Sequence, residues 1–125
     1  MSGKELAEFV LARLADDEAT ARAAVRTTEG GDVAGWYWSN AGDAVFLDGT
    51  ELPVACGPWR QPLHQPTAQH IVRWDPDRVM VECEAKRRAV ETLTSSVSDE
   101  RDDHLLRLLT LPYTHHPAYR PAWRP

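Results

Sequence analysis

The spacing of the apolar residues changes along the chain, and this change constrains the fold more than any single motif. From Ser2 to about Thr28, apolar residues recur every three or four positions, which predicts a long helix. The pair Gly30-Gly31 is expected to end it. From Val33 to Cys56, the sequences GWYWS, AVFLD and LPVAC are rich in β-prone residues and predict two or three short strands in a meander. A helix followed by a meander indicates an α+β fold.

Turn-forming residues refine this prediction. Asp48-Gly49 is a signal for a tight turn between strands. Pro53 lacks a backbone N–H, so the last strand is expected to lie at a sheet edge or to be irregular. From Gly57 to Pro66, three prolines and a glycine predict a loop that leads from the strands to a helical half.

Two further helices are expected to follow this loop. Thr67 is expected to cap a short one with the sequence AQHIVRW. Asp75 is expected to cap a second one, because Pro76 then occupies the first helical position, where its missing N–H costs nothing. The spacing of apolar residues extends this helix to about Leu93.

The C-terminal third combines a leucine-rich helix with a proline-rich tail. Ser98 or Asp99 is expected to start the helix, and its sequence HLLRLLTL predicts a well-buried element that Pro112 ends. The tail PYTHHPAYRPAWRP contains four prolines, so it is expected to be a strap docked on the domain and not a regular helix. The sequence therefore predicts a long N-terminal helix, a small antiparallel β-meander, two to three further helices and a Pro-rich C-terminal strap in one domain, 1–125.

Composition narrows the classes of function. The net charge of −5 provides no general attraction to phosphate backbones, so nucleic acid is not an expected partner. No stretch approaches the roughly 20 apolar residues of a membrane span, and no membrane partner is expected. The N-terminal residues do not form a signal peptide, and Cys56 and Cys83 are expected to be free thiols. These features predict a cytoplasmic location.

Three stretches carry a resemblance to a known family. They are FVLARLADDEATARAA (9–24), AQHIVRWDPDRVMVECEAKRRAVE (68–91) and LLRLLTLPYTHHPAYRPAWRP (105–125). As a set they resemble a family of small uncharacterised proteins, a domain of unknown function from high-GC Gram-positive bacteria and their phages. The resemblance implies a single compact bacterial domain. It implies no activity, cofactor or catalytic residue.

Candidate metal ligands and nucleophiles are present but scattered. His70, Cys83 and His116 are the candidates for a metal site, although zinc ligands usually occur as close pairs. Cys83 lies on the apolar stripe of its helix, where cysteine behaves as a small hydrophobic residue. No catalytic motif is present in the sequence, so neither a catalytic residue nor a cofactor is predicted. His70 is instead expected to be a buried histidine that is bonded to a carbonyl or to the strap.

Arginine and aromatic residues are the types enriched at the centres of protein interfaces. The candidate binding residues are Arg73, Trp74, Arg78, Arg87, Arg88, Tyr119, Trp123 and Arg124. We therefore predict a small cytoplasmic accessory protein that acts by protein–protein contact, with a homodimer left open. The alternatives are a metal-dependent enzyme or nucleic-acid-acting protein that uses the His/Cys site, and a phage- or host-directed modulator.

Overall fold

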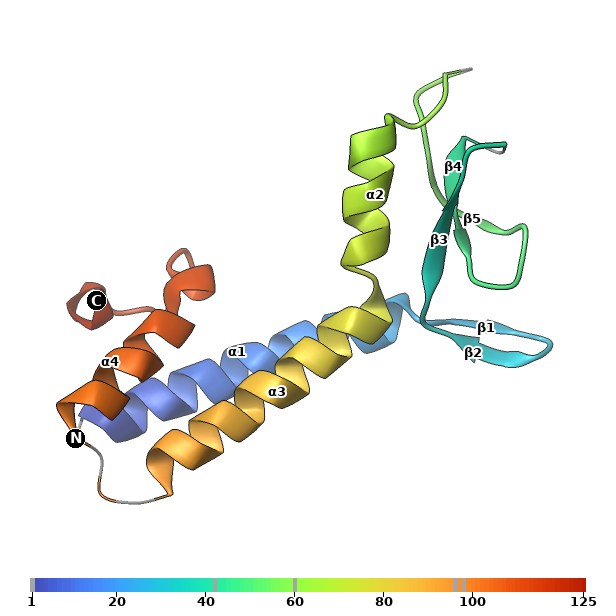
Figure 1. Ribbon diagram of the computed structural model, residues 1–125. Coiled ribbons are helices and arrows are strands. Elements are labelled where there is room, and N and C mark those ends of the chain that lie inside the picture. The colour runs from blue at the N-terminus through green and yellow to red at the C-terminus, as the bar shows by residue number, and fades with distance from the viewer. Residues whose placement is uncertain (1, 42, 60, 96, 98) are drawn as a thin grey trace. The chain divides into compact units, whose positions relative to one another are not determined.

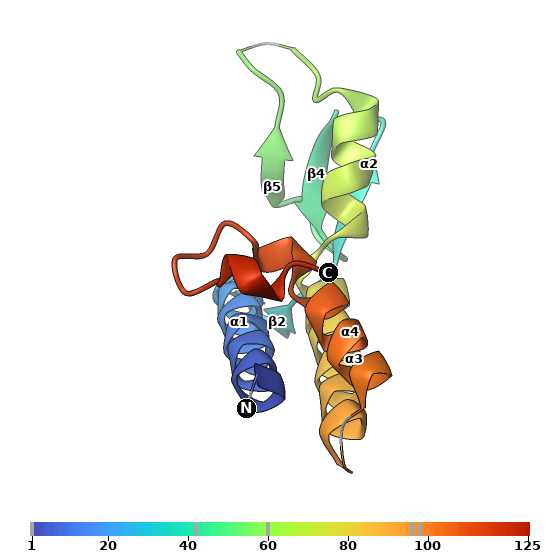
Figure 2. The same ribbon diagram turned by 90° about the vertical axis from the view of Figure 1, so that its left-hand side faces the viewer.

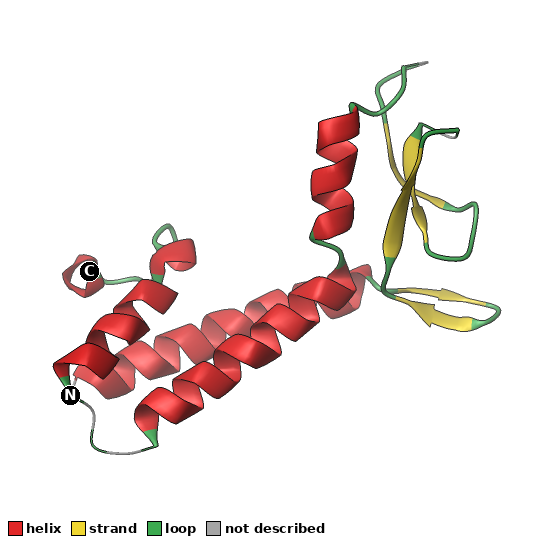
Figure 3. Cartoon of the chain, viewed as in Figure 1, coloured by secondary structure: helices red, strands yellow, loops and turns green. Residues whose placement is uncertain are grey.

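The computed structural model describes residues 2–41, 43–59, 61–95, 97 and 99–125, and it confirms the α+β class (Figure 3). Among the helices described, none is long and apolar enough to cross a membrane. The elements in chain order are α1 (Ser2–Ala24), β1 (Arg26–Thr28), β2 (Gly31–Val33), β3 (Trp36–Ser39), β4 (Ala44–Leu47), β5 (Pro53–Cys56), α2 (Gln65–Arg73), α3 (Pro76–Thr94), α4 (Glu100–Leu109) and the 3₁₀ turns η1 (Leu111–Tyr113) and η2 (Pro121–Trp123).

The chain forms two compact units, and the helices α1 and α3 each contribute residues to both. The first unit contains Met1–Glu18 and Glu82–Pro125, and the second contains Ala19–Val81. In the first unit, α1 and α3 run in opposite directions, and α4 runs in the direction opposite to α3 (Figures 1 and 2). The C-terminal strap lies over α1 in the same unit (Figure 2).

The core of the first unit is built by residues spaced three, four or seven apart on its helices, because such residues share one face. Its buried members include Leu6, Ala7, Phe9, Val10, Leu14, Cys83, Val90, Leu106, Thr110 and Trp123. The strap contributes Trp123 to this core, so the predicted docking of the tail is confirmed. The tail contains two 3₁₀ turns, η1 and η2, each with a proline at its start, where the ring is tolerated.

The second unit contains the predicted meander. The strands β3, β4 and β5 are antiparallel neighbours in that order, and α2 packs against β3 and β4. Pro53 lies in β5 at the edge of the sheet, and the pairing of β4 with β5 shifts register between Val45 and Phe46. Gly49 has a φ of 71°, so the turn signal at Asp48-Gly49 is confirmed by a conformation that favours glycine.

The predicted end of the first helix is wrong. The helix ends at Ala24, and the next residues form a two-stranded hairpin in which Arg26 pairs with Val33. The glycines close this hairpin, and Gly31 has a φ of 112°. Thr27 lies in the first strand and donates its hydroxyl to Asp32 across the pair at 2.8 Å. The β-branched residues of this segment suit a strand better than a helix terminus.

The junction of α2 and α3 is predicted well at one cap and poorly at the other. Asp75 accepts the backbone N–H of Arg78 at 2.9 Å, so it caps α3 as expected, and its other oxygen accepts the N–H of Trp36 at 3.2 Å. The predicted cap at Thr67 is wrong, because α2 begins at Gln65 with Pro66 in its first turn. Proline is well suited to a first turn, and this preference places the helix start before Thr67.

The last helix begins as predicted but is less buried than expected. Asp99 caps α4 by accepting the N–H of Asp102 at 2.9 Å, while Ser98 lies outside the described residues. Leu106 is fully buried, but Leu105, Leu108 and Leu111 are 37%, 40% and 46% exposed. A single helix face cannot bury every leucine of the run LLRLL, because neighbouring residues point about 100° apart.

Candidate functional site

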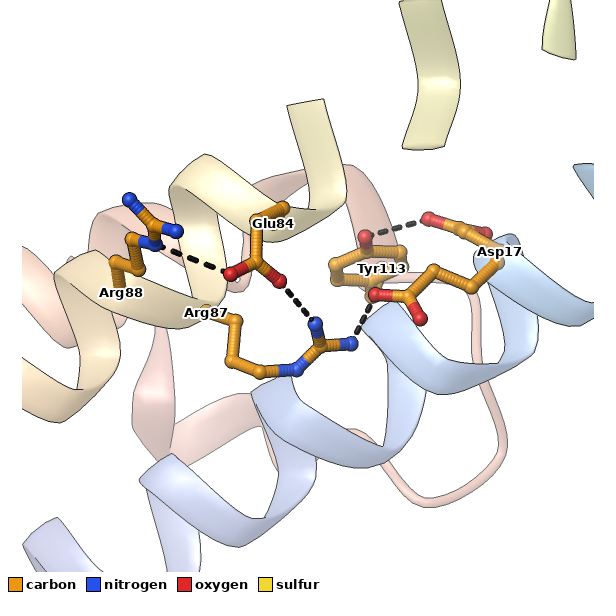
Figure 4. Close-up of polar contacts among 6 residues, drawn as sticks. Asp17, Glu84, Arg87, Arg88 and Tyr113 are labelled. Carbon is orange, nitrogen blue, oxygen red and sulfur yellow. Dashed lines mark hydrogen bonds and ion pairs between the residues drawn. The ribbon is translucent and has the colours of Figure 1, made fainter. Parts of the chain in front are cut away.

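A polar cluster in the first unit contains two of the predicted binding residues. Arg87 of α3 pairs with Glu18 of α1, and it also donates to Glu84 at 2.7 Å (Figure 4). Arg88 donates to the other oxygen of Glu84 at 3.0 Å. The Glu18 side chain is 10% exposed and the Arg88 side chain 76% exposed. Arg87 therefore ties α3 to α1 inside the unit, whereas Arg88 lies at its surface.

The neighbouring carboxylate, Asp17, is used by the strap. It accepts the phenol O–H of Tyr113 at 2.6 Å, which joins α1 to the turn η1 (Figure 4). Burial, together with the bond to Asp17, raises the pKa of Tyr113 above its ordinary value. Burial and the charges of Asp17 and Glu18 raise the pKa of the Cys83 thiol as well. Cys83 is 3% exposed, and these conditions favour an inert thiol over a nucleophile.

The strap docks on the aromatic ring of Phe9. The ring centroid of Trp123 lies 5.1 Å from that of Phe9, and the rings of Tyr119 and His116 lie at 6.0 and 5.8 Å. Trp123 is 5% exposed, so this predicted binding residue is an internal anchor of the strap. Tyr119 is half-buried in the same cluster.

Hydrogen bonds from arginines hold the strap beside this cluster. Arg13 donates to Nδ1 of His116 at 2.9 Å, and the backbone N–H of Ala118 points at the same nitrogen at 3.1 Å. Nδ1 is therefore an acceptor, because arginine is a donor only. Arg120 donates to Glu5 of α1 at 2.8 Å. Arg124 follows the turn η2 and is exposed.

The remaining predicted binding residues lie together in the second unit. Trp74 stands between α2 and α3 and is 45% exposed. The guanidinium of Arg78 stacks over its ring at 4.3 Å, and the ring of His70 lies 6.4 Å away. Arg73 precedes Trp74 and is exposed. The cation–π stacking of Arg78 on the exposed ring of Trp74 stabilises the junction of α2 and α3 by about 0.5–1 kcal/mol.

The candidate metal ligands occupy different environments. His70 is exposed in the second unit, so the expectation of a buried histidine is wrong: the outer face of α2 carries it. Cys83 and His116 belong to the first unit, one in the core and one in the strap. Across the part of the chain that the structure describes, no group of three or more His, Cys, Asp or Glu side chains is arranged to hold a metal ion.

An apolar groove between α3 and α4 was missed by the sequence reasoning. It has a volume of about 380 Å³, lies wholly in the first unit, and is lined by Ala89, Thr92, Leu93, Leu105, Leu108 and Leu109. The signal was present in the leucine run itself, because LLRLL carries more apolar residues than one buried helix face accepts. The sequence predicts that this run is buried, whereas Leu105 and Leu108 stay partly exposed along the groove.

A second and larger groove in the same unit has a mixed lining. It has a volume of about 1030 Å³ and is lined by Gly3, Lys4, Ala7, Glu8, Leu11, Thr94, Val97, Asp99, Glu100 and Asp103. The lining combines negative carboxylates with positive groups, namely a lysine and the N-terminal ends of α1 and α4. The two signs of charge partly cancel. This lining selects no single class of ligand.

Comparisons with known proteins place the chain in a family. No curated protein and no solved structure matches it. A family model described as a family of unknown function (DUF6221) matches residues 3–125, which include all three stretches that carried the resemblance. The chain thus belongs to the DUF6221 family.

Proposed function

We propose that this protein is a small accessory protein that acts by binding another protein, without catalysis, through the groove between α3 and α4. The observation that carries the proposal is the exposure of Leu105 and Leu108 along this groove. Both leucines are about two-fifths exposed, although the same helix buries Leu106 completely. An apolar ridge beside an apolar groove is the surface that receives an amphipathic helix in many complexes.

The magnitude of this exposure supports a modest contact. Burying a whole leucine side chain contributes about 1.5–3 kcal/mol. About two-fifths of the surface of Leu105 and of Leu108 is exposed. Covering this surface would therefore contribute about 0.6–1.2 kcal/mol of binding free energy for each residue. The groove residues add to this, and the sum suits a regulated contact better than a permanent one.

The residues predicted from the sequence contribute differently to this proposal. Arg87, Tyr119 and Trp123 are engaged inside the first unit, and we assign them to folding. Arg73, Trp74 and Arg78 form an exposed surface of the second unit, and their role in binding stays a prediction, as do those of Arg88 and Arg124. The metal-dependent enzyme and the modulator also stay as alternatives.

Photo-crosslinking in the native host tests the proposal. A photoreactive amino acid at Leu108, which lines the groove, is compared with the same amino acid at Leu111, which is similarly exposed but does not line it. We expect a discrete protein crosslink from position 108 and none from position 111. Equal crosslinking from both positions, or none from position 108, would contradict the proposal.

We further propose that the protein is encoded by a bacterium or its phage and works in the bacterial cytoplasm. Cys56 and Cys83 are both free thiols, which is typical of proteins in a reducing compartment. The bacterial and phage origin rests on the resemblance of the three stretches to the family.

A further inference from the structure

The groove between α3 and α4 has no charged residue in its lining, but cations lie near its two ends. On α3, Lys86 precedes Leu93 by seven residues, which places the two within about 20° on the helix surface. On α4, Arg101 precedes Leu108 by seven residues, so these two also lie within about 20° on the helix surface. Because α3 and α4 run in opposite directions, these two cations lie toward opposite ends of the groove (Figures 1 and 2).

These two cations are available to a partner. Neither Lys86 nor Arg101 forms an ion pair or hydrogen bond with its side chain among the described residues. In the part of the chain that the structure describes, nearby acids form no ion pair with them. Glu82, one turn before Lys86, is engaged in an interaction of its own, and Asp102 lies on the side of α4 that turns toward the buried Leu106.

From this arrangement, and resting on the proposed function, we infer that the groove binds an amphipathic helical segment of a partner protein with a leucine-rich face and a carboxylate near each end. The lining spans about one turn on each helix and matches leucine-type side chains spaced three or four apart. The acidic ends would then meet Lys86 and Arg101.

The overall charge of the protein opposes an acidic partner only weakly. The chain carries a net charge of −5, but the Debye length is about 8 Å at physiological ionic strength. Charges farther away than this are largely screened. Of the acids closer to Arg101, Asp99 caps α4, Asp103 pairs with Arg107, and Glu100 lines the other groove, so Arg101 is the charge that α4 presents at this groove. The two cations determine orientation and partner choice more than affinity.

A second copy of this chain fits the groove less well. A stable dimer buries about 800 Å² on each partner, whereas the groove is formed by six residues. If two α4 helices paired in opposite directions, Arg101 would face the end of α4 that carries Leu108 and Thr110 and no carboxylate. If they paired in the same direction, Arg101 would face its own copy. Neither arrangement satisfies the cation.

Fluorescence anisotropy of the full chain with two labelled peptides tests this inference. One probe is a designed amphipathic helix with leucines on one face and two glutamates at each end. The matched probe has lysines in place of those glutamates. We expect the acidic probe to bind more tightly, and we expect K86Q and R101Q to weaken it by about twofold to fivefold each and to leave the basic probe unweakened.

Two further variants separate the charge inference from the groove itself. The charge reversal K86E/R101E is expected to prefer the basic probe, and L105Q/L108Q is expected to lose both probes. All four side chains are at least partly exposed, so these variants are expected to fold, which their circular dichroism and thermal unfolding check.

The outcomes distinguish the inference from the proposed function. Equal binding of both probes, lost only in L105Q/L108Q, would overturn the inference and leave the groove as a docking surface. Failure of both probes would overturn the inference. If the protein then also sedimented as a dimer that L105Q/L108Q dissolved, a second copy would be the occupant.

Discussion

Two adjacent carboxylates near the middle of α1, Asp17 and Glu18, bind different partners from distant parts of the chain. Asp17 accepts from Tyr113, which follows it by 96 residues, and Glu18 pairs with Arg87, which follows it by 69. Three consecutive acidic residues, 16–18, are typical of a solvated helix face. Glu18 is nevertheless buried, because its side chain lies against α3, while Asp16 points to solvent beside Arg13.

The two cysteines are expected to react at very different rates. Burial raises the pKa of the Cys83 thiol, and the side chain is 3% exposed, whereas Cys56 is exposed. In the native protein, a thiol reagent such as DTNB should modify one cysteine quickly at pH 8. The variant C56S should then react only as fast as the protein opens, and C83S should keep the fast reaction. Fast modification of C56S would contradict this environment for Cys83.

Tyr113 should make stability fall at alkaline pH. Burial raises the pKa of Tyr113 in the folded state above the value of about 10 that it has when unfolded. Its contribution is therefore complete below about pH 10 and is lost as the pH rises toward the folded-state pKa, because the unfolded chain deprotonates first.

The variant Y113F provides the comparison. Near neutral pH it should be less stable than the wild type by about 1–2 kcal/mol, because Asp17 loses its hydrogen bond. Between about pH 10 and 12, the free energy of unfolding should fall less steeply in Y113F than in the wild type. Urea unfolding at several pH values measures both effects, and parallel pH profiles would refute the assignment.

At the scale of elements, the strap shows how an irregular segment is stabilised without backbone ladders. Its residues from Tyr113 to Trp123 surround Phe9. Arg13 of α1 bonds to the strap, and Arg120 of the strap bonds to α1. The sequence predicted that the tail docks, since its aromatic residues needed burial. It did not predict Phe9 as the receptor, because nothing local in the tail identifies a ring on α1.

Truncation of the strap anchor should be costly. W123A is expected to lower the free energy of unfolding by about 3–5 kcal/mol, because it removes a buried ring that contacts Phe9. W59A, at a position 84% exposed, should change it by less than about 1 kcal/mol. If W123A does not fold, W123F should show a smaller loss in the same direction. Equal effects of W59A and W123F would be inconsistent with a docked strap.

Capping residues explain which helix boundaries could be predicted. Asp75 and Asp99 each accept a backbone N–H three residues later, and both helix starts were predicted correctly from these residues. The end of α1 was not, because Gly30-Gly31 signals a turn after a helix as well as a turn within a hairpin. The choice between them depends on whether residues 26–28 find a strand partner, and Gly31–Val33 provides it.

At the scale of the whole molecule, α1 and α3 each extend through both compact units. Neither unit has a complete set of helices of its own, because α1 and α3 are each divided between the two. Unfolding one unit would therefore break helices that the other uses. We therefore expect a single cooperative transition in scanning calorimetry, with equal calorimetric and van't Hoff enthalpies. Two resolved transitions would show that the units unfold independently.

The sequence by itself determined the features that depend on a few neighbouring residues. These are the α+β class, the turn at Asp48-Gly49, the helix starts at Asp75 and Asp99, and the proline-rich tail. Backbone hydrogen bonds to nearby side chains and the restricted φ of proline operate over three or four residues, so a local pattern suffices to predict them.

Only the tertiary structure decided which distant residues meet and which apolar residues stay partly uncovered. In it, Arg87 pairs with Glu18, and Trp123 packs on Phe9. Leu105 and Leu108 lie beside a groove, whereas Leu106 is buried. Such contacts join residues that are far apart in the chain, and they depend on where whole elements pack. The free energy that favours one packing over the others is the sum of contacts over the entire core. No single segment of the sequence determines it.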